Sequence, residues 1–344
     1  MRIHLASYQS IMLNRGGPTY KLLHLKKALE KLGVYVKFFD MWDFNLKLTD
    51  DDLVHIFLSN TSTFSLANNL KLYGAKYVVN PIIFSNHPAW EIKLYKTLEK
   101  PLNKLFVRSI SDYRITEQIC NNAEKVLPNT IDEGNLLVKG MGVDKNKIQV
   151  IHNGVEKRFA EADPVLFKKE YGLKDFILYV GHLGPDRKNG KNIIKAIQQI
   201  DHPAVIIADI LHNEEGDWCR QEIEKSKNIK LIEWLNHDDP LFASAYAACH
   251  TFILPTKYET PGRAALEAGL AGANIVITPN GGTKEYFGGL AEYPDIKSVD
   301  SITEAIKRSL SIEKSDALKK RILKNFIWEV IALETASMYK QIIR

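Results

Sequence analysis

Two glutamates are the first side chains whose spacing suggests chemistry. Glu259 follows the apolar run TFILP (251–255), which predicts a buried strand, and Glu267 lies within PGRAALEAGLAG (261–272). This second stretch predicts a helix that Pro261 begins, because proline fits the first helical turn. The spacing places Glu267 two helical turns beyond Glu259. One carboxylate can therefore sit at the start of the helix while the other reaches a second part of an extended ligand.

The backbone at this helix start can also bind a ligand. The N–H groups near Gly262 and Arg263 lack partners within the helix, so they can bind hydroxyls or a phosphate. Ligands of open α/β sheets bind beyond the carboxyl ends of the strands, where this loop is predicted to lie. A structural role remains open for each glutamate taken alone. Glu259 would then stabilise the helix dipole, and Glu267 would be a solvated helix residue.

A loop with two adjacent cations is the second candidate. Arg187 and Lys188 lie in GHLGPDRKNGKN (181–192), between the predicted strand FILYVG (176–181) and a helix-period segment. A strand end that carries two cations suits an anionic ligand. The alternative is a polar loop that caps the next helix and leaves Lys188 in solvent.

A third candidate, NRGGPTY (14–20), lies between the first predicted strand and the first predicted helix. Gly16 and Gly17 let the backbone approach a ligand closely. Pro18 suits the first helical turn, and Arg15 adds a charge at the same rim. The alternative is an ordinary turn. The pattern GxGxxG is absent, which excludes a dinucleotide fingerprint here.

Short apolar runs alternate with helix-period segments along nearly the whole chain. Strands are predicted at residues 2–8, 34–39, 53–59, 76–84, 176–181, 204–209, 229–234, 251–255 and 274–279. This alternation predicts parallel sheets that helices cover on both faces. The polar stretch 153–164 separates two series, so we expect one domain over 1–158 and another over 159–325. A helix over 325–343 either finishes the second domain or returns to the first.

Length and composition narrow the class of protein. The 344 residues, 45% of them hydrophobic, fit two globular domains of about 150 residues each. No run approaches the ~20 apolar residues of a membrane span, and the start MRIHLASY has the pattern of a strand rather than of a signal peptide. Three separated cysteines predict reduced thiols in a cytoplasmic protein. The net charge of +5 lies in residues 1–163, which suits an anionic small molecule or membrane surface but not a nucleic-acid binder.

One segment resembles the donor-site signature of glycosyltransferase family 4. It holds a glutamate, seven residues, a second glutamate, a small-residue helix and a strand (ETPGRAALEAGLAGANIVIT, 259–278), then a Gly-Gly turn and a glutamate (GGTKE, 281–285). Further stretches resemble that family in the same order, namely 16–33, 147–155, 176–197 and the final helix. The resemblance implies the α/β fold called GT-B, in which two Rossmann-like domains with parallel sheets face each other across a cleft. Part of 326–344 would return to the N-terminal, acceptor-binding domain, and 159–325 would hold the nucleotide sugar.

The resemblance also implies roles for individual residues. Glu259 would contact hydroxyls of the donor sugar, and Glu267 would accept hydrogen bonds from the ribose diol. Lys188, with Arg187 beside it, would neutralise the leaving nucleoside diphosphate. Other donor-binding residues would be Gly16, Gly17, Gly181, Thr260, Gly262 and Arg263. His182 stands where the family usually has arginine; histidine lacks that bidentate fork, so diphosphate binding is either weaker or depends on Arg187.

The acceptor side is less sharply defined by the sequence. Members of the family often carry a histidine after a strand of the first domain. The comparable stretch here, KYVVNPIIFSNHPAW (76–90), has Asn80 near the expected position and His87 further on. We take Asn80, His87 and Arg15 as candidate acceptor-side residues, with an ordinary polar loop as the alternative for His87.

Together these features predict a retaining glycosyltransferase that moves a sugar from a nucleotide-diphosphate sugar to a glycan, lipid-linked or small-molecule acceptor. Cell-surface polysaccharide or glycolipid synthesis is the expected setting. No Asp-x-Asp triplet stands out, so we expect no metal, and no cofactor is expected. The departing phosphate would help to take the proton of the acceptor, and no side chain is assigned as general base. The alternatives are a sugar-nucleotide epimerase, a glycosyl phosphorylase, or a non-catalytic nucleotide-sugar-binding subunit, which only His182 favours.

A basic stripe is predicted on one helix face within residues 90–108, provided that Pro101 only kinks that helix. Its members recur every three or four residues: Lys93, Lys96, Lys100 and Lys104. Such a stripe can hold a protein at the anionic inner face of a membrane. The alternative is an ordinary solvated helix face.

Overall fold

The computed structural model describes residues 1–13, 16–85, 87–105 and 110–343. The chain forms two compact units, one of Met1–Gly154 together with Trp328–Arg344, the other of Val155–Ile327. At the boundary, the backbone N–H of Val155 donates a hydrogen bond to the carbonyl of Phe326 at 2.8 Å. This bond joins the two connecting segments to each other at the edge of the second unit.

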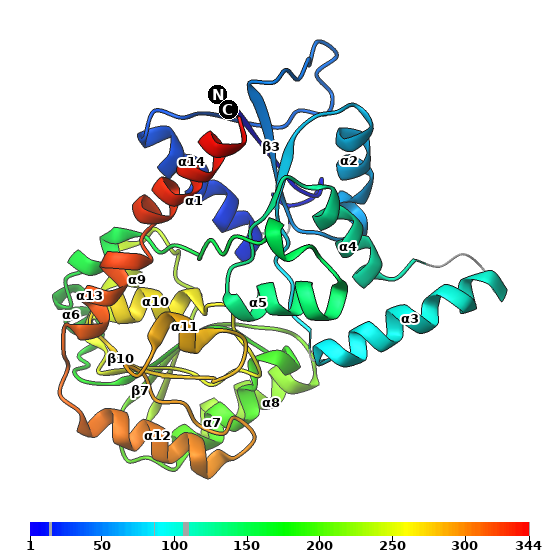
Figure 1. Cartoon of the computed structure of the whole chain (residues 1–344). Helices are drawn as coiled ribbons and strands as arrows, with labels where there is room; N and C mark the ends of the chain where they lie inside the picture. Colours follow the sequence, from blue (N-terminus) through cyan, green and yellow to red (C-terminus); the bar gives the residue numbers. More distant parts are fainter. Residues whose placement is uncertain (14–15, 86, 106–109, 344) are drawn as a thin grey trace. The chain divides into compact units, whose positions relative to one another are not determined.

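The first unit, in which Figure 1 labels β3, holds a parallel sheet in the order β2-β1-β3-β4-β5. Its strands are β1 (Arg2–Ala6), β2 (Tyr35–Phe38), β3 (Asp52–Phe57), β4 (Tyr77–Asn80) and β5 (Lys125–Val126). Its helices are α1 (Gly17–Lys31), α2 (Thr61–Leu72), α3 (Ala89–Leu105), α4 (Asp112–Asn122), α5 (Ile131–Leu136), the π-helical turn Leu137–Met141 and α14 (Trp328–Ile342). Strand β1 pairs with β2 on one side and with β3 on the other, so the side on which strands are added changes between β2 and β3.

The second unit holds a parallel sheet in the order β10-β9-β6-β7-β8. Its strands are β6 (Ile177–Leu183), β7 (Ala204–Ile210), β8 (Ile229–Glu233), β9 (Thr251–Leu254) and β10 (Asn274–Ile277). Its helices are α6 (Val165–Tyr171), α7 (Gly190–Gln198), α8 (Glu214–Lys225), α9 (Pro240–Ala248), α10 (Arg263–Leu270), α11 (Thr283–Phe287), α12 (Val299–Ser311) and α13 (Ala317–Asn325). Here β7 and β8 lie on one side of β6, and β9 and β10 lie on the other, so the order of strand addition changes sides between β6 and β9.

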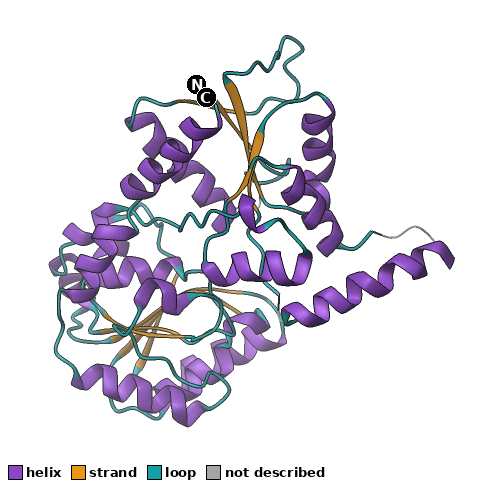
Figure 2. Ribbon diagram, in the orientation of Figure 1, coloured by secondary structure: helices purple, strands orange, loops and turns teal. Residues whose placement is uncertain are grey.

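Helices cover both faces of each sheet (Figure 2). In the first unit, α1 packs with α14 on one face and α2 packs with α4 on the other. Every residue of β3 is therefore buried, which explains why its sequence is a nearly continuous apolar run. The predicted α/β class with parallel sheets is confirmed. Within the described ranges, no helix is both long enough and apolar enough to cross a bilayer.

The C-terminal helix α14 belongs to the first unit, which decides between the two positions that the sequence left open. The indole of Trp328, its first residue, stacks on the ring of His24 in α1, with 5.8 Å between the ring centroids. Gly154 lies so close that a Cβ there would be 2.5 Å from Trp328 Cδ2. A side chain at position 154 would push the start of α14 away.

The buried side chain of His55 ties α14 to the sheet. Its Nδ1 lies 2.5 Å from the hydroxyl of Tyr339, and its Nε2 lies 3.0 Å from Oδ1 of Asn80. Because Oδ1 only accepts, Nε2 carries the proton and Nδ1 accepts from Tyr339. Burial, with the charge of Lys21, lowers the pKa of His55 to about 3.

The pH dependence of unfolding should report this histidine. Between its ordinary pKa of 6.5 and its folded value of about 3, His55 takes up a proton only in the unfolded chain. This uptake favours the unfolded chain. The free energy of unfolding is therefore highest above pH 6.5 and falls by about 1.4 kcal/mol for each pH unit below it. In urea titrations, the unfolding free energy of wild type should fall between pH 7 and pH 5 by about 2 kcal/mol more than that of His55→Gln. Equal losses in the two proteins would contradict this assignment.

Candidate functional site

The candidate site lies at the carboxyl ends of β6 and β9, which are paired neighbours in the second sheet. The chain runs outward from β6 through β7 to β8 and then returns to β9. Loops that follow neighbouring strands diverge at such a reversal and leave a crevice where ligands bind. Residues 184–189 follow β6 and residues 255–262 follow β9, so the two predicted charged loops lie at one place.

Glu259 binds both of the predicted cations. Its Oε1 accepts hydrogen bonds from Nζ of Lys188 and Nη1 of Arg187, each at 3.1 Å. The hydroxyl of Thr256 donates to the same oxygen at 3.2 Å. The side chains of Glu259 and Lys188 are only 12% and 14% exposed, whereas that of Arg187 is 38% exposed. Two cations share one carboxylate, so the cluster keeps a positive charge that suits a diphosphate.

Asn189 fastens the cationic turn to the strand ends. It follows the 3₁₀ turn Asp186–Lys188 and adopts a left-handed backbone with φ 58°, which asparagine tolerates. Its Nδ2 donates to the carbonyl oxygens of Pro255 and Ile296, both at 2.9 Å. Our sequence interpretation missed this role, although Asn-Gly at 189–190 is a typical turn signal. The position of Lys188 therefore depends on an asparagine that was not among the predicted residues.

The Gly-Gly turn supports Glu259 from another side. The N–H of Glu259 donates to the carbonyl of Asn280 at 3.1 Å. Gly281 has φ +89°, and a Cβ there would lie 2.5 Å from the carbonyl oxygen of Glu259. Only glycine permits both the backbone angle and this close approach. Gly262, with φ +84°, is the residue just before α10, and a Cβ there would lie 3.1 Å from two strand side chains.

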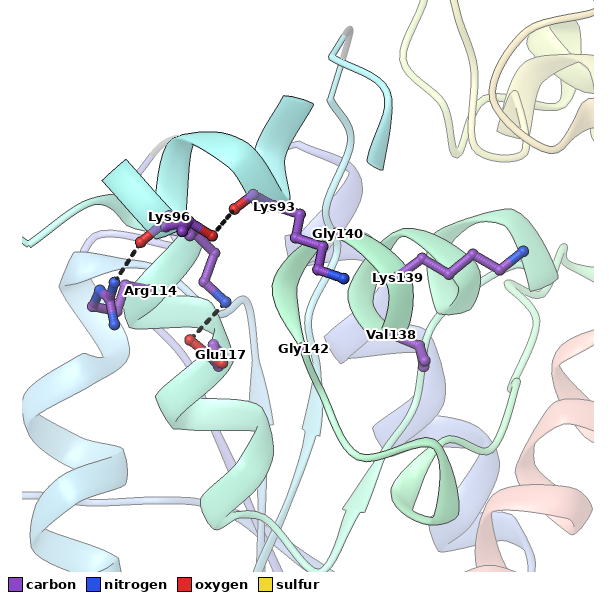
Figure 3. Close-up of a pocket in the computed structure, with 9 residues that line it drawn as sticks. Lys93, Lys96, Arg114, Glu117, Val138, Lys139, Gly140 and Gly142 are labelled. Atoms are coloured by element: carbon purple, nitrogen blue, oxygen red, sulfur yellow. Dashed lines mark hydrogen bonds and ion pairs between the residues drawn. The ribbon is translucent and has the colours of Figure 1, made fainter. Parts of the chain in front are cut away.

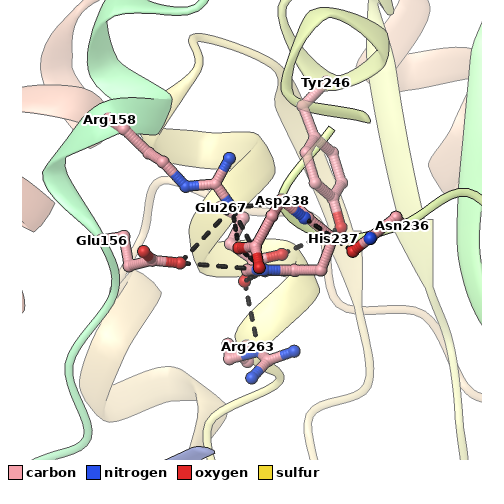
Figure 4. A network of polar contacts seen from close by, with 8 residues as sticks. All are labelled: Glu156, Arg158, Asn236, His237, Asp238, Tyr246, Arg263 and Glu267. Atoms are coloured by element: carbon pink, nitrogen blue, oxygen red, sulfur yellow. Dashed lines mark hydrogen bonds and ion pairs between the residues drawn. The ribbon is translucent and has the colours of Figure 1, made fainter. Parts of the chain in front are cut away.

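Glu267 lies on α10 within a buried polar network (Figure 4). Its Oε1 accepts a hydrogen bond from Nε2 of His237 at 2.9 Å and lies 3.2 Å from Nε of Arg263. Its Oε2 accepts a hydrogen bond from the hydroxyl of Tyr246 at 3.1 Å. Arg158 donates in turn to the carbonyl of His237 at 2.7 Å. Sequence reasoning found Glu267 and Arg263 but missed the other three, which come from separate segments without a motif.

The network keeps Glu267 ionised although the side chain is only 2% exposed. Burial by itself raises the pKa of Glu267, but the charge of Arg263 and the hydrogen bonds of His237 and Tyr246 outweigh it, so the pKa lies below its ordinary value. The alternative of a solvated helix residue is therefore wrong for Glu267. Both carboxylate oxygens already have partners. The side chain of Arg263 is 33% exposed and that of His237 is 11% exposed, so Arg263 is the easier partner for a ligand to displace.

His182 and Gly181 lie at the end of β6. About half of the His182 side chain is exposed; its ring stacks on Trp234, with 5.9 Å between centroids, and its Nδ1 lies 3.3 Å from Asp209. The hydroxyl of the buried Tyr179 donates to the carbonyl of His182 at 2.9 Å. A Cβ at Gly181 would lie 3.1 Å from that hydroxyl, which explains a small residue there. Burial, with the charge of Glu259, raises the pKa of Tyr179, so this hydroxyl stays protonated.

The glycines predicted in the first unit lie at the start of α1. Gly16 is the residue before the helix, and Gly17 is its first residue. A Cβ added at Gly17 would meet nothing within 4 Å, so the helix start is open to a ligand. Arg15, predicted at the same rim, lies outside the described residues.

The two other acceptor-side candidates lie in different environments. Asn80 is only 1% exposed; its Oδ1 accepts from His55 and its Nδ2 donates to the carbonyl of Leu127. We therefore correct its assignment: its amide supports the core beneath the strand ends. The side chain of His87 is 64% exposed, and its Nδ1 lies 2.9 Å from Glu91 on the first turn of α3.

Comparison with known proteins gives a family match within the second unit. Residues 166–325 match the family described as glycosyl transferases group 1. O-antigen chain mannosyltransferase B of Escherichia coli is 28% identical over 192 residues, which are 53% of this chain and 50% of that protein. The chain spans about half the length of the first curated relatives that it matches.

Solved structures resemble the fold of the whole chain. A glycosyltransferase from Rickettsia africae ESF-5 has a TM-score of 0.73 at 15% identity, over 99% of this chain and 98% of that one. HepE of Anabaena, solved in complex with UDP, has a TM-score of 0.69 at 16% identity, over 99% of this chain and 100% of that one. The predicted GT-B fold is confirmed.

Proposed function

We propose that the chain is a retaining glycosyltransferase of family 4 that takes a sugar from a nucleotide-diphosphate donor. The observation that carries the proposal is the cluster of Glu259, Lys188 and Arg187 at the reversal point of the second sheet. The group 1 domain over 166–325 supports the same class of reaction. So does the likeness to a mannosyltransferase of O-antigen chains.

In this proposal, the cluster holds the pyrophosphate and the reacting sugar. Lys188 and Arg187 turn from Glu259 toward the phosphates and neutralise the charge that grows on the bridging oxygen as it leaves the anomeric carbon. Glu259, released from its cations, accepts hydrogen bonds from sugar hydroxyls. Backbone groups from Thr260 to Arg263 at the start of α10 add further donors. The departing phosphate takes the proton of the acceptor, and these charges act without a metal.

The nucleoside is assigned to the Glu267 network. A ribose diol that displaces Arg263 would meet a carboxylate that is already ionised and held in place by His237 and Tyr246. The displaced guanidinium would then be available for the diphosphate. HepE was solved with UDP, so UDP-sugars are the first donors to test. The proposed acceptor is a glycan or glycolipid of the cell surface.

A donor screen tests this function. The purified protein is mixed with UDP-, GDP-, ADP- and CDP-sugars, and thermal unfolding and donor cleavage are measured in the presence of EDTA. We expect one donor to raise the unfolding temperature and to be cleaved, because two protein cations stabilise the leaving diphosphate. When an acceptor is added to the same mixture, NMR of the glycoside product should show the anomeric configuration of the donor.

The other outcomes distinguish the rivals. Stabilisation by a donor without turnover across acceptor panels would favour a non-catalytic binding subunit. Release of an epimerised sugar without transfer would favour an epimerase. Activity that appears only after a divalent cation is added would contradict metal independence.

A further inference from the structure

Helix α3 of the first unit carries apolar side chains on its outward face. Trp90, Leu94 and Leu98 recur every four residues and are 65%, 52% and 53% exposed, so they form one row along the helix. Ile92, on the opposite face, is 1% exposed and anchors the helix to the unit. The helix continues through Pro101. Lys100 and Lys104 of the predicted stripe lie outside the described side chains.

Helix α3 also lines a basic pocket (Figure 3). The cavity, of about 520 Å³, is lined by residues of α3, α4 and the π-helical turn Leu137–Met141. Within it, Lys96 pairs with Glu117 at 2.7 Å. Lys93 and Lys139 also line the cavity, and neither has an acidic partner among the described residues. The pocket therefore keeps two uncompensated positive charges.

The packing of α3 brings these charges close to the apolar row. A Cβ at Gly140 would lie 3.2 Å from Cα of Ala89, so the π-helical turn fits directly against the first turn of α3. Lys139 is the residue before Gly140, and Trp90 is the residue after Ala89. Lys93 lies one helical turn beyond Trp90, on the flank of the row. Both cations therefore belong to the part of the unit where the π-helical turn packs on α3, and Lys93 lies next to the helix face that carries the apolar row.

We propose that this part of the unit docks the protein on an anionic lipid bilayer. Trp90, Leu94 and Leu98 enter the headgroup region, while Lys93 and Lys139 bind lipid phosphates. A helix with an apolar outer row and basic flanks lies in the plane of the interface, where tryptophan is favoured. The net charge of the chain lies in residues 1–163, which adds attraction to an anionic surface.

A second exposed apolar segment of the chain has acidic rather than basic neighbours. Trp42 and Phe44 are 86% and 99% exposed, but Asp40 and Asp43 lie beside them in the loop after β2. Anionic lipids would repel that loop. Trp42 is therefore a matched control for Trp90.

Vesicle co-sedimentation tests the proposal with the purified chain. We expect binding to phosphatidylcholine vesicles that contain phosphatidylglycerol, and no binding to pure phosphatidylcholine. The double variant Lys93→Gln/Lys139→Gln should lower the partition coefficient by roughly 25-fold, because each lysine near an anionic surface contributes roughly five-fold. Trp90→Ser/Leu94→Ser should reduce binding to background by removing the apolar row.

Two control variants keep the test specific. Lys31→Gln/Lys71→Gln removes the same charge from exposed positions on α1 and α2, and Trp42→Ser removes an indole that is even more exposed than that of Trp90. Both should bind vesicles as wild type does.

Equal loss in the lysine controls, or no preference of wild type for anionic vesicles, would overturn the proposal. So would a dimer in light scattering that Trp90→Ser dissociates while vesicle binding is absent. Vesicle binding needs no sugar donor, so its outcome is independent of the proposed transfer reaction.

Discussion

The variant Lys188→Ala should turn over the donor about 10²- to 10³-fold more slowly than wild type, the usual loss when one preorganised charge is removed from a reacting oxyanion. Lys188 is the more buried cation of the cluster, with 14% of its side chain exposed and its Nζ 3.1 Å from Glu259. Water cannot fully replace a cation at such a position. Steady-state donor turnover measures the effect, and circular dichroism checks that the fold is retained.

Lys191 supplies the matched control for this prediction. It lies in the first turn of α7, with its Nζ 5.8 Å from the centre of the Trp218 ring. Lys191→Ala removes the same charge three residues from Lys188, and we expect turnover close to wild type. Lys188→Arg should keep part of the activity because it keeps the charge. Wild-type turnover in Lys188→Ala, or equal losses in both alanine variants, would reject the assignment of Lys188 to the leaving diphosphate.

Glu259→Gln should change turnover and nucleotide binding in opposite directions. Turnover should fall about 10²-fold, because the donor sugar loses a charged hydrogen-bond acceptor that orients it. The Kd for the bare nucleoside diphosphate should fall roughly five-fold, because removing a negative charge beside the diphosphate relieves about 1 kcal/mol of repulsion. Calorimetry with the diphosphate and donor assays with the same preparation measure both effects.

Glu292→Gln is the control for Glu259→Gln. Glu292 pairs with Arg308 at 2.8 Å, and its replacement removes the same charge from the same unit. We expect unchanged turnover and unchanged Kd. If Glu259→Gln weakened diphosphate binding and left turnover intact, Glu259 would act only as a structural partner of Lys188 and Arg187.

Local sequence patterns were sufficient for every strand of the two sheets except the two-residue strand β5. The apolar runs predicted at 53–59 and 251–255 lie at β3 and β9, because parallel strands that are covered on both faces need apolar side chains at successive positions. Glycine positions were equally informative. Gly262 and Gly281 have positive φ, a conformation that other residues rarely adopt, so these glycines mark the turns around Glu259.

Long-range contacts of the site were only partly predictable. Lys188 and Glu259 were expected together because both follow strands, yet 71 residues separate them, and they meet because β6 and β9 are neighbours in the sheet. The partners of Glu267 gave no signal, since His237, Tyr246 and Arg158 lie in three segments without a shared motif. Lys93 and Lys96 of the lysine stripe in turn became part of a pocket only through the packing of Leu137–Met141 against α3.

The sequence by itself determined the alternation of strands and helices, the sharp turns, and the kinds of charged side chain at the strand ends of the second unit. These properties depend on spacing along the chain and on the backbone angles of single residues. The tertiary structure decided that α14 packs on the first unit, that Asn80 is buried in its core, and that His237 and Tyr246 hold Glu267. Those contacts depend on strand order and on packing between segments far apart in the chain, which no local pattern of residues encodes.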